Sequence, residues 1–384
     1  MRKRILFIES RYQTFYGAQK SMAAFIKALD TEYFESKVVL AGKGKLEDEL
    51  KKLNIDVDVI KLGKKADAFG GKILNYSVAS KIIVLVQIFI FNLRLIPYIV
   101  KNKIDAVYAN DFRALFYVVV ASKLLRKKII LYIRTDITYN LFTKAGIFLS
   151  DYIITIAKGV LKNLPQNVTD KYDKKTYKIY TGFEFDKFSI MPKEQSKMLL
   201  DIDSKEIVIG FVGSINERKG LDLLIAAIYE MCKSCNNITL LIAGDITSGS
   251  EGYWKNLKNI IQKNNLKVKH VGYFTEMNLI YSAIDILVLP SRMEGLPRVI
   301  IEGMAHGLPV IASDVGGVKE IIQDESLGLI IPADSITSLI KALSELIYSE
   351  DIRAKMASTA KVYVKEKFSE EKFKKSINEL LMNI

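Results

Sequence analysis

Cysteine, proline and tryptophan are scarce in this sequence, and its uncharged apolar runs are short. The 384 residues include two cysteines, seven prolines and one tryptophan, against 49% hydrophobic residues. Two thiols cannot staple a disulfide-rich scaffold, and so much apolar content with so little proline excludes a disordered chain. The longest uncharged apolar stretch, residues 82–93, is shorter than the ~20 residues of a membrane-spanning helix. These shortages predict a globular protein with large hydrophobic cores.

Acidic residues are too few in the amino-terminal half to balance its basic ones. Residues 1–188 contain 33 Lys and Arg against 18 Asp and Glu, a formal charge of +15, whereas the remainder carries −2. This asymmetry predicts an anionic partner for the first half, and we favour an anionic membrane surface. No groove-reading or base-stacking motif accompanies the charge, so we expect no nucleic-acid binding. We expect residues 82–93 to form a buried core helix; with Arg94 and Lys101 close by, an interfacial helix is the alternative.

The few cysteines and histidines also limit metal and redox chemistry. Cys232 and Cys235 follow a helical pattern, whereas redox-active thiol pairs open helices, so we expect two reduced thiols at a helix end. His270 and His306 are poorly placed to complete a zinc site with them. The sequence contains no carboxylate cluster of the magnesium-binding type, which predicts chemistry without a metal.

Short apolar strands alternate with helical patterns along the whole chain, which predicts an α/β fold of two doubly wound parallel sheets. In the first half we expect strands at residues 5–8, 37–40, 57–60, 105–109, 129–133 and 152–156, and helices at residues 18–29, 77–100, 112–125 and 139–149. In the second half we expect strands at residues 207–212, 239–243, 268–272, 286–289, 310–312 and 329–331, and helices at residues 221–231, 254–264, 297–306, 336–348 and 369–382. A linker is expected at residues 180–204.

The most informative stretch is residues 290–303, P-S-R-M-E-G-L-P-R-V-I-I-E-G. The apolar run before it, residues 286–289, predicts a buried parallel strand. Pro297 suits the first turn of a helix, because its missing N–H costs nothing there. Glu294 would then lie in the loop and Glu302 inside the helix, with free amides between them that can receive an anionic ligand.

Continued through residue 317, this stretch resembles glycosyltransferase family 4. Members of that family are retaining, nucleotide-sugar-dependent enzymes of the GT-B fold, in which two Rossmann-like domains face a central cleft. The resemblance implies that Glu294 contacts the donor hexose and Glu302 the ribose hydroxyls. The donor would also be bound by the helix start, which comprises Gly295, Leu296 and Pro297. The alternative is an ordinary βαβ unit with surface glutamates.

A second motif, residues 210–220 (G-F-V-G-S-I-N-E-R-K-G), follows a predicted strand and opens a predicted helix. Glycines such as Gly213 allow close backbone approach, and helix amides together with a lysine form a pyrophosphate cradle. The resemblance implies that Lys219 holds the donor phosphates. The family has an arginine where Ser214 stands, so Arg218 would either supply the missing charge or point into solvent.

Residues of the first half are candidates for the phosphate and acceptor side. Gly17, in Y-G-A-Q, resembles the family's glycine loop, usually G-G-x-E, which approaches the donor phosphate; a plain loop glycine is the alternative. Arg134 follows a strand, where the family often has a histidine, and is too basic to act as a general base. We expect it to bind a phosphate, to polarise a sugar hydroxyl or to pair with Asp136. Asn110 and Asp111 follow another strand and are expected to touch the acceptor.

The resemblance also predicts the domain boundaries and the reaction. Residues 1–188 would form the acceptor and membrane-facing domain, residues 189–366 the nucleotide-sugar-binding domain, and residues 367–384 a helix that packs back on the first. Catalysis would depend on Glu294, Lys219 and Arg134, with no metal and no cofactor other than the UDP- or GDP-linked sugar itself. The products would be an α-glycoside of a glycan or lipid-linked acceptor, in bacterial surface polysaccharide or glycolipid synthesis.

The sequence also predicts where the protein is located, and it leaves two alternative functions open. The chain opens with Arg and Lys and runs straight into an apolar strand, so no secretory signal is visible and we expect a cytoplasmic protein, or one attached to the inner face of the plasma membrane. One rival is a non-catalytic accessory subunit of a glycosylation complex, favoured by Ser214, Gln19 and Arg134. The other is a nucleotide-sugar epimerase or hydrolase, although a hydrolase usually places two carboxylates around the scissile bond.

Overall fold

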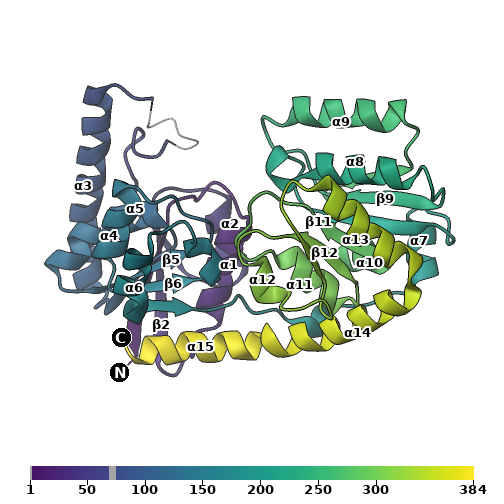
Figure 1. The fold of residues 1–384 in the computed structure, drawn as a ribbon. Coiled ribbons are helices and arrows are strands. Elements are labelled where there is room, and N and C mark those ends of the chain that lie inside the picture. The colour runs from purple at the N-terminus through teal and green to yellow at the C-terminus, as the bar shows by residue number, and fades with distance from the viewer. Residues whose placement is uncertain (1, 69–74) are drawn as a thin grey trace. The chain divides into compact units, whose positions relative to one another are not determined.

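The computed structural model describes residues 2–68 and 75–384, and the fold consists of two compact units. Unit 1 comprises Met1–Gly182 and Glu370–Ile384, and unit 2 comprises Phe183–Ser369. The chain therefore passes from one unit to the other at Gly182 and back at Glu370, whereas the sequence analysis placed these transitions at residues 188 and 367. Each unit holds one parallel sheet with helices around it, which confirms the predicted α/β fold class (Figure 1).

Unit 1 is built on a sheet of seven strands in the order β3-β2-β1-β4-β5-β6-β7. The strands are β1 (Lys3–Glu9), β2 (Phe34–Leu40), β3 (Val57–Val59), β4 (Ala106–Ala109), β5 (Lys128–Ile133), β6 (Tyr152–Thr155) and β7 (Thr176–Lys178). Strands β1 and β4 pair in parallel, with Ile5 opposite Ala106 and Ile8 opposite Ala109. These central strands are buried along nearly their whole length, as expected for strands covered on both faces. Strand β7 was not predicted, because its three residues are polar and lie at the sheet edge.

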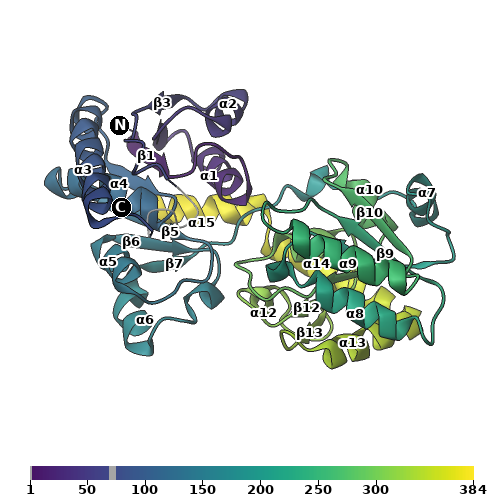
Figure 2. The same cartoon turned by 90° about the horizontal axis from the view of Figure 1, so that it is seen from above.

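The helices of unit 1 lie between and after these strands. They are α1 (Gly17–Lys27), α2 (Lys45–Lys52), α3 (Val78–Lys101), α4 (Phe112–Leu124), α5 (Leu141–Leu149), η1 (Lys158–Leu161), α6 (Gln166–Tyr172), η2 (Asp173–Lys175) and α15 (Glu370–Met382). Helix α15 packs on α1, where the rings of Phe25 and Phe373 meet edge to face with centroids 6.4 Å apart. On the other side of the sheet, α3 runs along α4, and the Asn92 side chain donates to the Phe116 carbonyl at 3.1 Å (Figure 2).

Helix α3 departs most from the prediction. It has 24 residues, and by length and composition it is long and apolar enough to cross a membrane. The expectation of a buried core helix was wrong, because only 28% of its most apolar window is buried. Its buried residues form a single stripe: Val84, Phe91, Asn92, Leu95 and Ile99. The prediction failed because an apolar run does not reveal how much of it the neighbouring helices will cover.

Unit 2 is built on a sheet of six strands in the order β10-β9-β8-β11-β12-β13. The strands are β8 (Ile207–Val212), β9 (Ile238–Ala243), β10 (Val268–Gly272), β11 (Ile286–Leu289), β12 (Val310–Ser313) and β13 (Leu329–Ile331). Each lies within one residue of its predicted range, because most of them are short apolar runs bounded by polar residues or glycine; β10, V-K-H-V-G, is the exception. Strand β11 pairs with β8 on one side, Leu287 opposite Gly210, and with β12 on the other.

The helices of unit 2 include several that the sequence analysis did not anticipate. They are η3 (Phe185–Lys187), α7 (Lys193–Leu199), η4 (Glu217–Lys219), α8 (Leu221–Met231), α9 (Glu251–Lys263), α10 (Met277–Ala283), α11 (Arg298–Ala305), α12 (Val318–Ile321), α13 (Ile336–Tyr348) and α14 (Glu350–Lys367). Helix α7 lies inside the stretch predicted as a polar linker. Its polar sequence, K-E-Q-S-K-M-L, hid the helix, whose lysines have partners that only the tertiary structure brings close.

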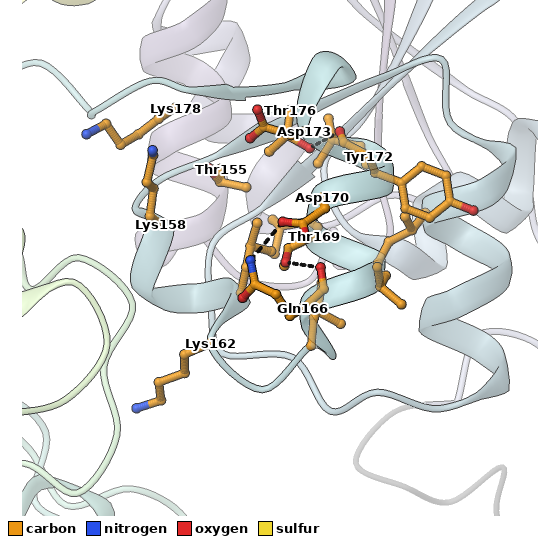
Figure 3. A pocket seen from close by; sticks show the side chains of 16 residues that line it. Thr155, Lys158, Lys162, Gln166, Thr169, Asp170, Tyr172, Asp173, Thr176 and Lys178 are labelled. Atoms are coloured by element: carbon orange, nitrogen blue, oxygen red, sulfur yellow. Dashed lines mark hydrogen bonds between the residues drawn. The ribbon is translucent and has the colours of Figure 1, made fainter.

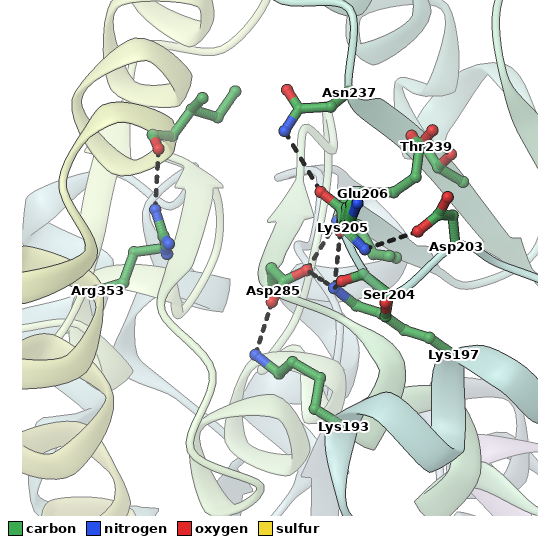
Figure 4. A network of polar contacts seen from close by, with 12 residues as sticks. Lys193, Lys197, Asp203, Ser204, Lys205, Glu206, Asn237, Thr239, Asp285 and Arg353 are labelled. Carbon is green, nitrogen blue, oxygen red and sulfur yellow. Dashed lines mark hydrogen bonds and ion pairs between the residues drawn. The ribbon is translucent and has the colours of Figure 1, made fainter.

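Asp285 joins α7 to the sheet of unit 2 through an ion-pair network (Figure 4). The ammonium of Lys197, whose side chain is only 5% exposed, lies 2.8 Å from Asp285 Oδ2 and donates to the Glu206 carbonyl at 2.7 Å. Lys193 reaches Asp285 Oδ1 at 2.7 Å, and the amide of Val208 donates to Oδ2 at 2.9 Å. Burial raises the pKa of Asp285, but the charge of Lys193 and the hydrogen bonds outweigh it, so this pKa lies below its ordinary value. The network therefore favours the folded state whenever Asp285 is ionised.

We predict that Asp285→Asn destabilises unit 2 by about 3–5 kcal/mol, because it leaves the buried Lys197 cation without a counter-ion. Lys193→Ala is the matched control: that side chain is 45% exposed, so its loss should cost at most about 1 kcal/mol. Denaturant unfolding followed by fluorescence of Trp254, the single tryptophan, reports on unit 2 alone. In the wild type, the contribution of Asp285 to the free energy of unfolding should be full above about pH 4. It should disappear as the pH falls through the lowered pKa of folded Asp285. Equal losses in the two variants would contradict the prediction.

Candidate functional site

In both sheets the order of strands reverses at one pair of neighbours. In unit 2 the chain adds β9 and β10 on one side of β8, and then β11, β12 and β13 on the other side. In unit 1 the same reversal occurs between β1 and β4. In doubly wound sheets, ligands bind at the carboxyl ends of the strands beside such a reversal, because the loops from the two strands diverge there. Each unit therefore offers one topologically favoured site, and candidate residues lie at both.

Lys219 and Glu294, 75 residues apart in the chain, meet at the reversal in unit 2. Lys219 ends η4, which follows β8, and its Nζ lies 2.6 Å from Oε1 of Glu294, in the loop that follows β11. The Ser291 hydroxyl donates to the same carboxylate oxygen at 2.7 Å. The side chains of Lys219 and Glu294 are 13% and 8% exposed, so the ion pair is largely buried. The structure thus brings together the residue assigned to the phosphate and the residue assigned to the hexose.

Arg218 lies beside this ion pair. Its guanidinium donates to the Met293 carbonyl at 2.8 Å and stands 3.8 Å from Oε2 of Glu294, although nearly half of the side chain remains exposed. The two expectations for Arg218 were a phosphate ligand or a solvent-directed side chain. The structure places its charge at the edge of the candidate site, within reach of a ligand at Lys219.

Two glycines allow the surrounding loops to pack closely. Gly220 has φ +70°, and a Cβ at this position would lie 2.0 Å from the Pro290 carbonyl oxygen. Gly316 has φ +54°, and a Cβ there would lie 2.0 Å from the Glu294 carbonyl oxygen. Any larger residue would clash with backbone and adopt a strained conformation. The loops after β8 and β12 therefore both rest against the loop after β11.

Arg292 fixes the relative position of two of these loops, and the sequence analysis missed it. Its guanidinium pairs with both carboxylate oxygens of Asp222 at 2.7 and 3.0 Å and with Asp334 at 2.7 Å, and it donates to the Glu217 carbonyl. Its own amide donates to the Arg218 carbonyl at 2.8 Å. Bidentate pairing gives geometric precision as well as energy. Nothing in the sequence around Arg292 indicated these partners, since Asp222 and Asp334 are distant in the chain.

Glu302 lies inside α11, as predicted. Its Oε2 accepts a hydrogen bond from the Tyr281 hydroxyl at 2.8 Å, and its Oε1 lies 3.3 Å from Nε of Arg298. Burial, followed by the charge of Glu302, raises the pKa of Tyr281 well above its ordinary value, so this hydroxyl remains a donor. These partners orient the carboxylate that is assigned to the ribose.

The helix start differs from the prediction by one residue. Helix α11 begins at Arg298, and Pro297 is its N-cap residue, with φ −73° and ψ 105°. The expectation that Pro297 belongs to the first turn was therefore wrong, because its ψ angle is extended. The carbonyl of Gly295 accepts a hydrogen bond from Gly317 at 2.6 Å, and the Leu296 side chain is buried. The first amides of a helix lack intrahelical acceptors, so this end of α11 can donate to an anion.

Ser214 occupies the position where the related family has an arginine. It follows Gly213, and its hydroxyl accepts a hydrogen bond from the Asn216 side chain at 3.0 Å. The Asn216 Oδ1 atom is buried and makes no hydrogen bond to any of the described residues. Gly213 itself lies beneath Lys219, whose Cε would be 3.7 Å from a Cβ at this position. A neutral polar pair thus stands in place of one cation.

The reversal in unit 1 is occupied by a buried polar cluster. Glu9, at the end of β1, accepts hydrogen bonds from the Asn110 side chain and from the amide of Arg11, the latter at 2.9 Å. Arg134, at the end of β5, donates to the side chain and carbonyl of Asn110 and to the Ala18 carbonyl. Burial, and next the charge of Asp111, raise the pKa of Glu9 to about 7, although Arg134 opposes this. Glu9 was missed because a single acidic residue in an apolar strand looks like a surface position.

Several predicted roles in unit 1 need correction. Arg134 does not pair with Asp136, which instead lies 3.4 Å from the Lys162 ammonium. Asp111 caps α4 by accepting from the amide of Ala114 at 2.7 Å, and it also accepts from the Ser10 hydroxyl at 2.5 Å. Asn110 is fully buried. Asn110 and Asp111 therefore hold the loops of unit 1 in place, and so does Arg134, whose guanidinium also lies 4.9 Å from the centroid of the Tyr132 ring.

Gly17 begins α1, and a Cβ there would meet no atom within 4 Å. Neither a tight turn nor close packing therefore requires glycine at position 17. Gln19 replaces the glutamate of the related family, and its side chain accepts from the Tyr16 amide at 3.0 Å and donates to the Arg11 carbonyl at 3.3 Å. The glutamine fixes the loop before α1 and leaves the backbone at Gly17 open.

A cavity of about 430 Å³ lies elsewhere in unit 1, under α6 and beyond the ends of β5, β6 and β7 (Figure 3). Its polar lining includes Thr155, Lys158, Lys162 and Lys178, and the Thr155 hydroxyl is buried without a hydrogen bond to the described residues. None of the predicted site residues lines it. This cavity and the predicted chemistry are therefore in different places.

Metal and thiol chemistry find little support in the described residues. Within residues 2–68 and 75–384, no three His, Cys, Asp or Glu side chains are grouped so as to hold a metal ion. Cys232 and Cys235 are free thiols at the end of α8, and burial raises the pKa of Cys232, which disfavours its reactive thiolate. His306 contacts Asn278 and the Glu302 carbonyl, and its ring stacks between Phe188 and Tyr281.

Comparison with known proteins shows what part of the chain is similar to a known family. Residues 192–363 match the family model described as glycosyl transferases group 1. An uncharacterized glycosyltransferase of Methanocaldococcus jannaschii is 30% identical over 245 residues, which are 63% of this chain and 62% of that protein. The lipopolysaccharide core biosynthesis mannosyltransferase LpsB of Rhizobium meliloti is 29% identical over 172 residues, 44% of this chain and 48% of its own. The chain thus spans about half to three-fifths of these relatives.

A solved structure matches over the whole length. Anabaena HepE, crystallised in complex with UDP, covers 100% of both chains with a TM-score of 0.80 at 19% identity. The two parallel-sheet units are therefore those of a GT-B glycosyltransferase fold, as the sequence resemblance implied.

We predict that Glu9 makes the stability of the protein depend on pH near neutrality. Because its pKa of about 7 in the folded state exceeds the ordinary value of 4.5, the folded state binds the extra proton. Stability should therefore fall as the pH rises from about 5 to 7, by at most about 1.4 kcal/mol per pH unit. Glu9→Gln should flatten this slope in urea unfolding followed by circular dichroism. Glu35→Gln is the control, since Arg4 and Lys37 lower the pKa of Glu35; a slope that survives Glu9→Gln would refute the assignment.

Proposed function

We propose that this protein transfers a hexose from a UDP- or GDP-linked sugar, with retention, to a glycan or lipid-linked acceptor, because residues 192–363 match the family model of the glycosyl transferases group 1. The observation that carries the proposal is the meeting of Lys219 with Glu294, 2.6 Å apart at the carboxyl ends of β8 and β11. Two loops that start from neighbouring strands deliver a cation and a carboxylate to one point, as a diphosphate-linked sugar requires.

The donor would bind along the carboxyl edge of the sheet in unit 2. Lys219 and Arg218 would hold the diphosphate together with the amides at the start of α11. Glu302, oriented by Tyr281, would accept hydrogen bonds from the ribose hydroxyls. Glu294 would receive the hexose hydroxyls and keep Lys219 in place through its other oxygen. Ser214 and Asn216 would add neutral donors and acceptors where the family has a second cation.

Transfer breaks the bond between the anomeric carbon and the diphosphate oxygen. Negative charge grows on the leaving diphosphate and positive charge on the anomeric carbon. Lys219, Arg218 and the α11 amides would stabilise the first charge, because fixed cations and dipoles act there without reorganisation. The carboxylate of Glu294 would stabilise the second. The acceptor oxygen forms the new bond on the same face, and its proton leaves with the diphosphate, which gives an α-glycoside.

The acceptor and its setting are proposed from unit 1. The carboxyl ends of β1, β4 and β5 carry Arg134, Asn110 and Glu9, and the cavity beyond β6 offers further polar groups. Arg134 would act by holding the loop after β4 against the first turn of α1, and so would position the acceptor and the diphosphate-binding backbone at Gly17. LpsB acts in lipopolysaccharide core synthesis, and we place this protein in surface polysaccharide or glycolipid synthesis at the cytoplasmic face of the membrane.

A non-catalytic accessory subunit is the second candidate. The replacement of the phosphate-binding arginine by Ser214 favours it, because the loss of one charge-assisted hydrogen bond costs about 1.5–3 kcal/mol of donor affinity. The buried pair of Lys219 and Glu294 favours the enzyme, since a decayed site would not keep two buried opposite charges in hydrogen-bond contact.

We predict that one nucleoside diphosphate, UDP or GDP, raises the melting temperature more than ADP does. At about one hundred times the dissociation constant, binding stabilises by about 2.7 kcal/mol. Lys219→Met should remove most of this ligand-dependent shift, whatever its effect on the ligand-free protein. Lys233→Met, which affects an exposed lysine paired with Glu230, should keep the full shift. A nucleotide shift that persists in Lys219→Met would place the diphosphate elsewhere.

We predict that Glu294→Gln slows sugar transfer about a hundredfold or more, with a smaller effect on binding of UDP or GDP alone. The amide keeps a hydrogen-bond acceptor for Ser291 but loses the charge that would face the anomeric carbon. Glu230→Gln is the matched control, because that side chain is exposed on the outer face of α8. The measurement is the single-turnover rate of sugar transfer in the wild type and in both variants, with the donor selected by thermal shift. Equal rates for wild type and Glu294→Gln would remove this carboxylate from the mechanism, and nucleotide binding without any transfer would favour the accessory subunit.

A further inference from the structure

Helix α3 presents an apolar stripe to solvent along its whole length. Exposed side chains recur at the spacing of one helix face, and we call them the α3 surface: Val78, Ile82, Leu85, Phe89, Leu93 and Val100. Leu85 is 66% exposed and Phe89 50%. Since successive residues turn by about 100°, this stripe lies about 120° around the helix axis from the buried stripe that packs on α4. Helix α3 is therefore apolar on both faces, and only one face is covered by the rest of unit 1.

An uncovered stripe of this length is unusual for a helix of a globular protein, whose outer face normally carries polar residues. Its 24 residues correspond to about 36 Å at 1.5 Å per residue. In Figure 1, α3 stands at the outer side of α4, with its far side away from the sheet of unit 1. Contiguous apolar patches of this kind mark interaction surfaces.

The charged side chains that α3 itself carries are of one sign. Between Asp67 and Asp105 the sequence contains five Lys or Arg residues and no Asp or Glu. Lys81, Arg94 and Lys101 lie on the helix itself. The partner must therefore combine an apolar interior with negative charge at its boundary, which describes a bilayer that contains anionic lipids.

The topology of unit 1 determines how α3 can meet such a bilayer. Strand β3 precedes the helix and β4 follows it, and both belong to the same sheet. A helix that crossed the membrane would place these two strands on opposite sides. Helix α3 must therefore lie in the plane of the interface, although its length would suffice for a span.

A second copy of the chain fits the α3 surface less well. A twofold interface brings the same patch of each copy together. Lys81, Arg94 and Lys101 of one copy would then meet the same cations of the other, with no acidic residue of the helix to compensate them. Like charges brought together in this way oppose association.

We propose that the α3 surface inserts into the headgroup boundary of an anionic bilayer, with Lys81, Arg94 and Lys101 on the lipid phosphates. The apolar stripe enters to the depth of about 5–10 Å that is typical of interfacial helices. This attachment does not depend on the proposed sugar transfer, but it would hold unit 1 where a lipid-linked acceptor is found.

Vesicle flotation with the full chain tests the proposal. The wild type should bind vesicles of phosphatidylcholine with phosphatidylglycerol, bind pure phosphatidylcholine weakly, and lose binding as the salt concentration rises. The double variant Leu85→Gln with Phe89→Gln should bind about tenfold or more weakly. The matched control is Ile352→Gln with Val362→Gln, which changes two exposed apolar residues of α14 in unit 2 and should bind as the wild type does. Circular dichroism confirms that all variants are folded.

Three outcomes would overturn the proposal. They are no binding to anionic vesicles, binding that the α3 double variant retains, and a dimer in analytical ultracentrifugation that the same variant abolishes. Insertion is checked with Phe89→Trp, whose fluorescence should shift to shorter wavelength when anionic vesicles are added. The nucleotide-dependent thermal shift should be unchanged in the α3 double variant, so that failure of membrane binding and failure of donor binding are distinguishable.

Discussion

Parallel pairing of β8 with β11 is the constraint on which the candidate site of unit 2 depends. The pairing fixes the carboxyl ends of two strands that are far apart in the chain, and the loops that follow them carry Lys219 and Glu294. Gly220 allows the loop after β8 to contact the Pro290 carbonyl, which lies just before Glu294 in the chain. Arg292 holds both loops to Asp222. A one-residue change of register in either strand would turn its buried side chains to the other face of the sheet, so the register is strongly specified. The chemistry of the site is therefore a consequence of strand order.

The two units stabilise charge at their reversals in different ways. In unit 2, Lys219 meets a carboxylate directly, so that opposite charges compensate each other and both remain available to a ligand. In unit 1, Glu9 and Arg134 are linked through Asn110, and their charges are balanced mainly by amide groups. The first arrangement suits a ligand that carries charge. The second makes a rigid support for the loops around it, with an acid whose protonation changes near neutral pH.

Features that depend on local sequence pattern were predicted correctly, and features that depend on contacts between distant residues were not. Strands such as β8, β11 and β13 were predicted to the residue, because a short apolar run with polar ends has few other structures available. Helix α7 was missed because its polar sequence resembles a linker. The pairing of Arg134 with Asp136 was wrong because proximity in sequence does not decide which acceptors a guanidinium reaches. Arg292 and Tyr281 were missed because their roles consist only of contacts with distant residues.

The sequence by itself determined the α/β class, the two sheets, and the identity of Lys219, Glu294 and Glu302 as candidates, since these depend on local pattern and on motif. Only the tertiary structure decided that Lys219 and Glu294 are in contact, that Glu9 is buried beside Asn110, and that one face of α3 remains uncovered. The physical reason is the same in each case. Burial and ion pairing depend on which segments the sheet order brings together. The residues next to a side chain in sequence do not determine which residues lie next to it in space.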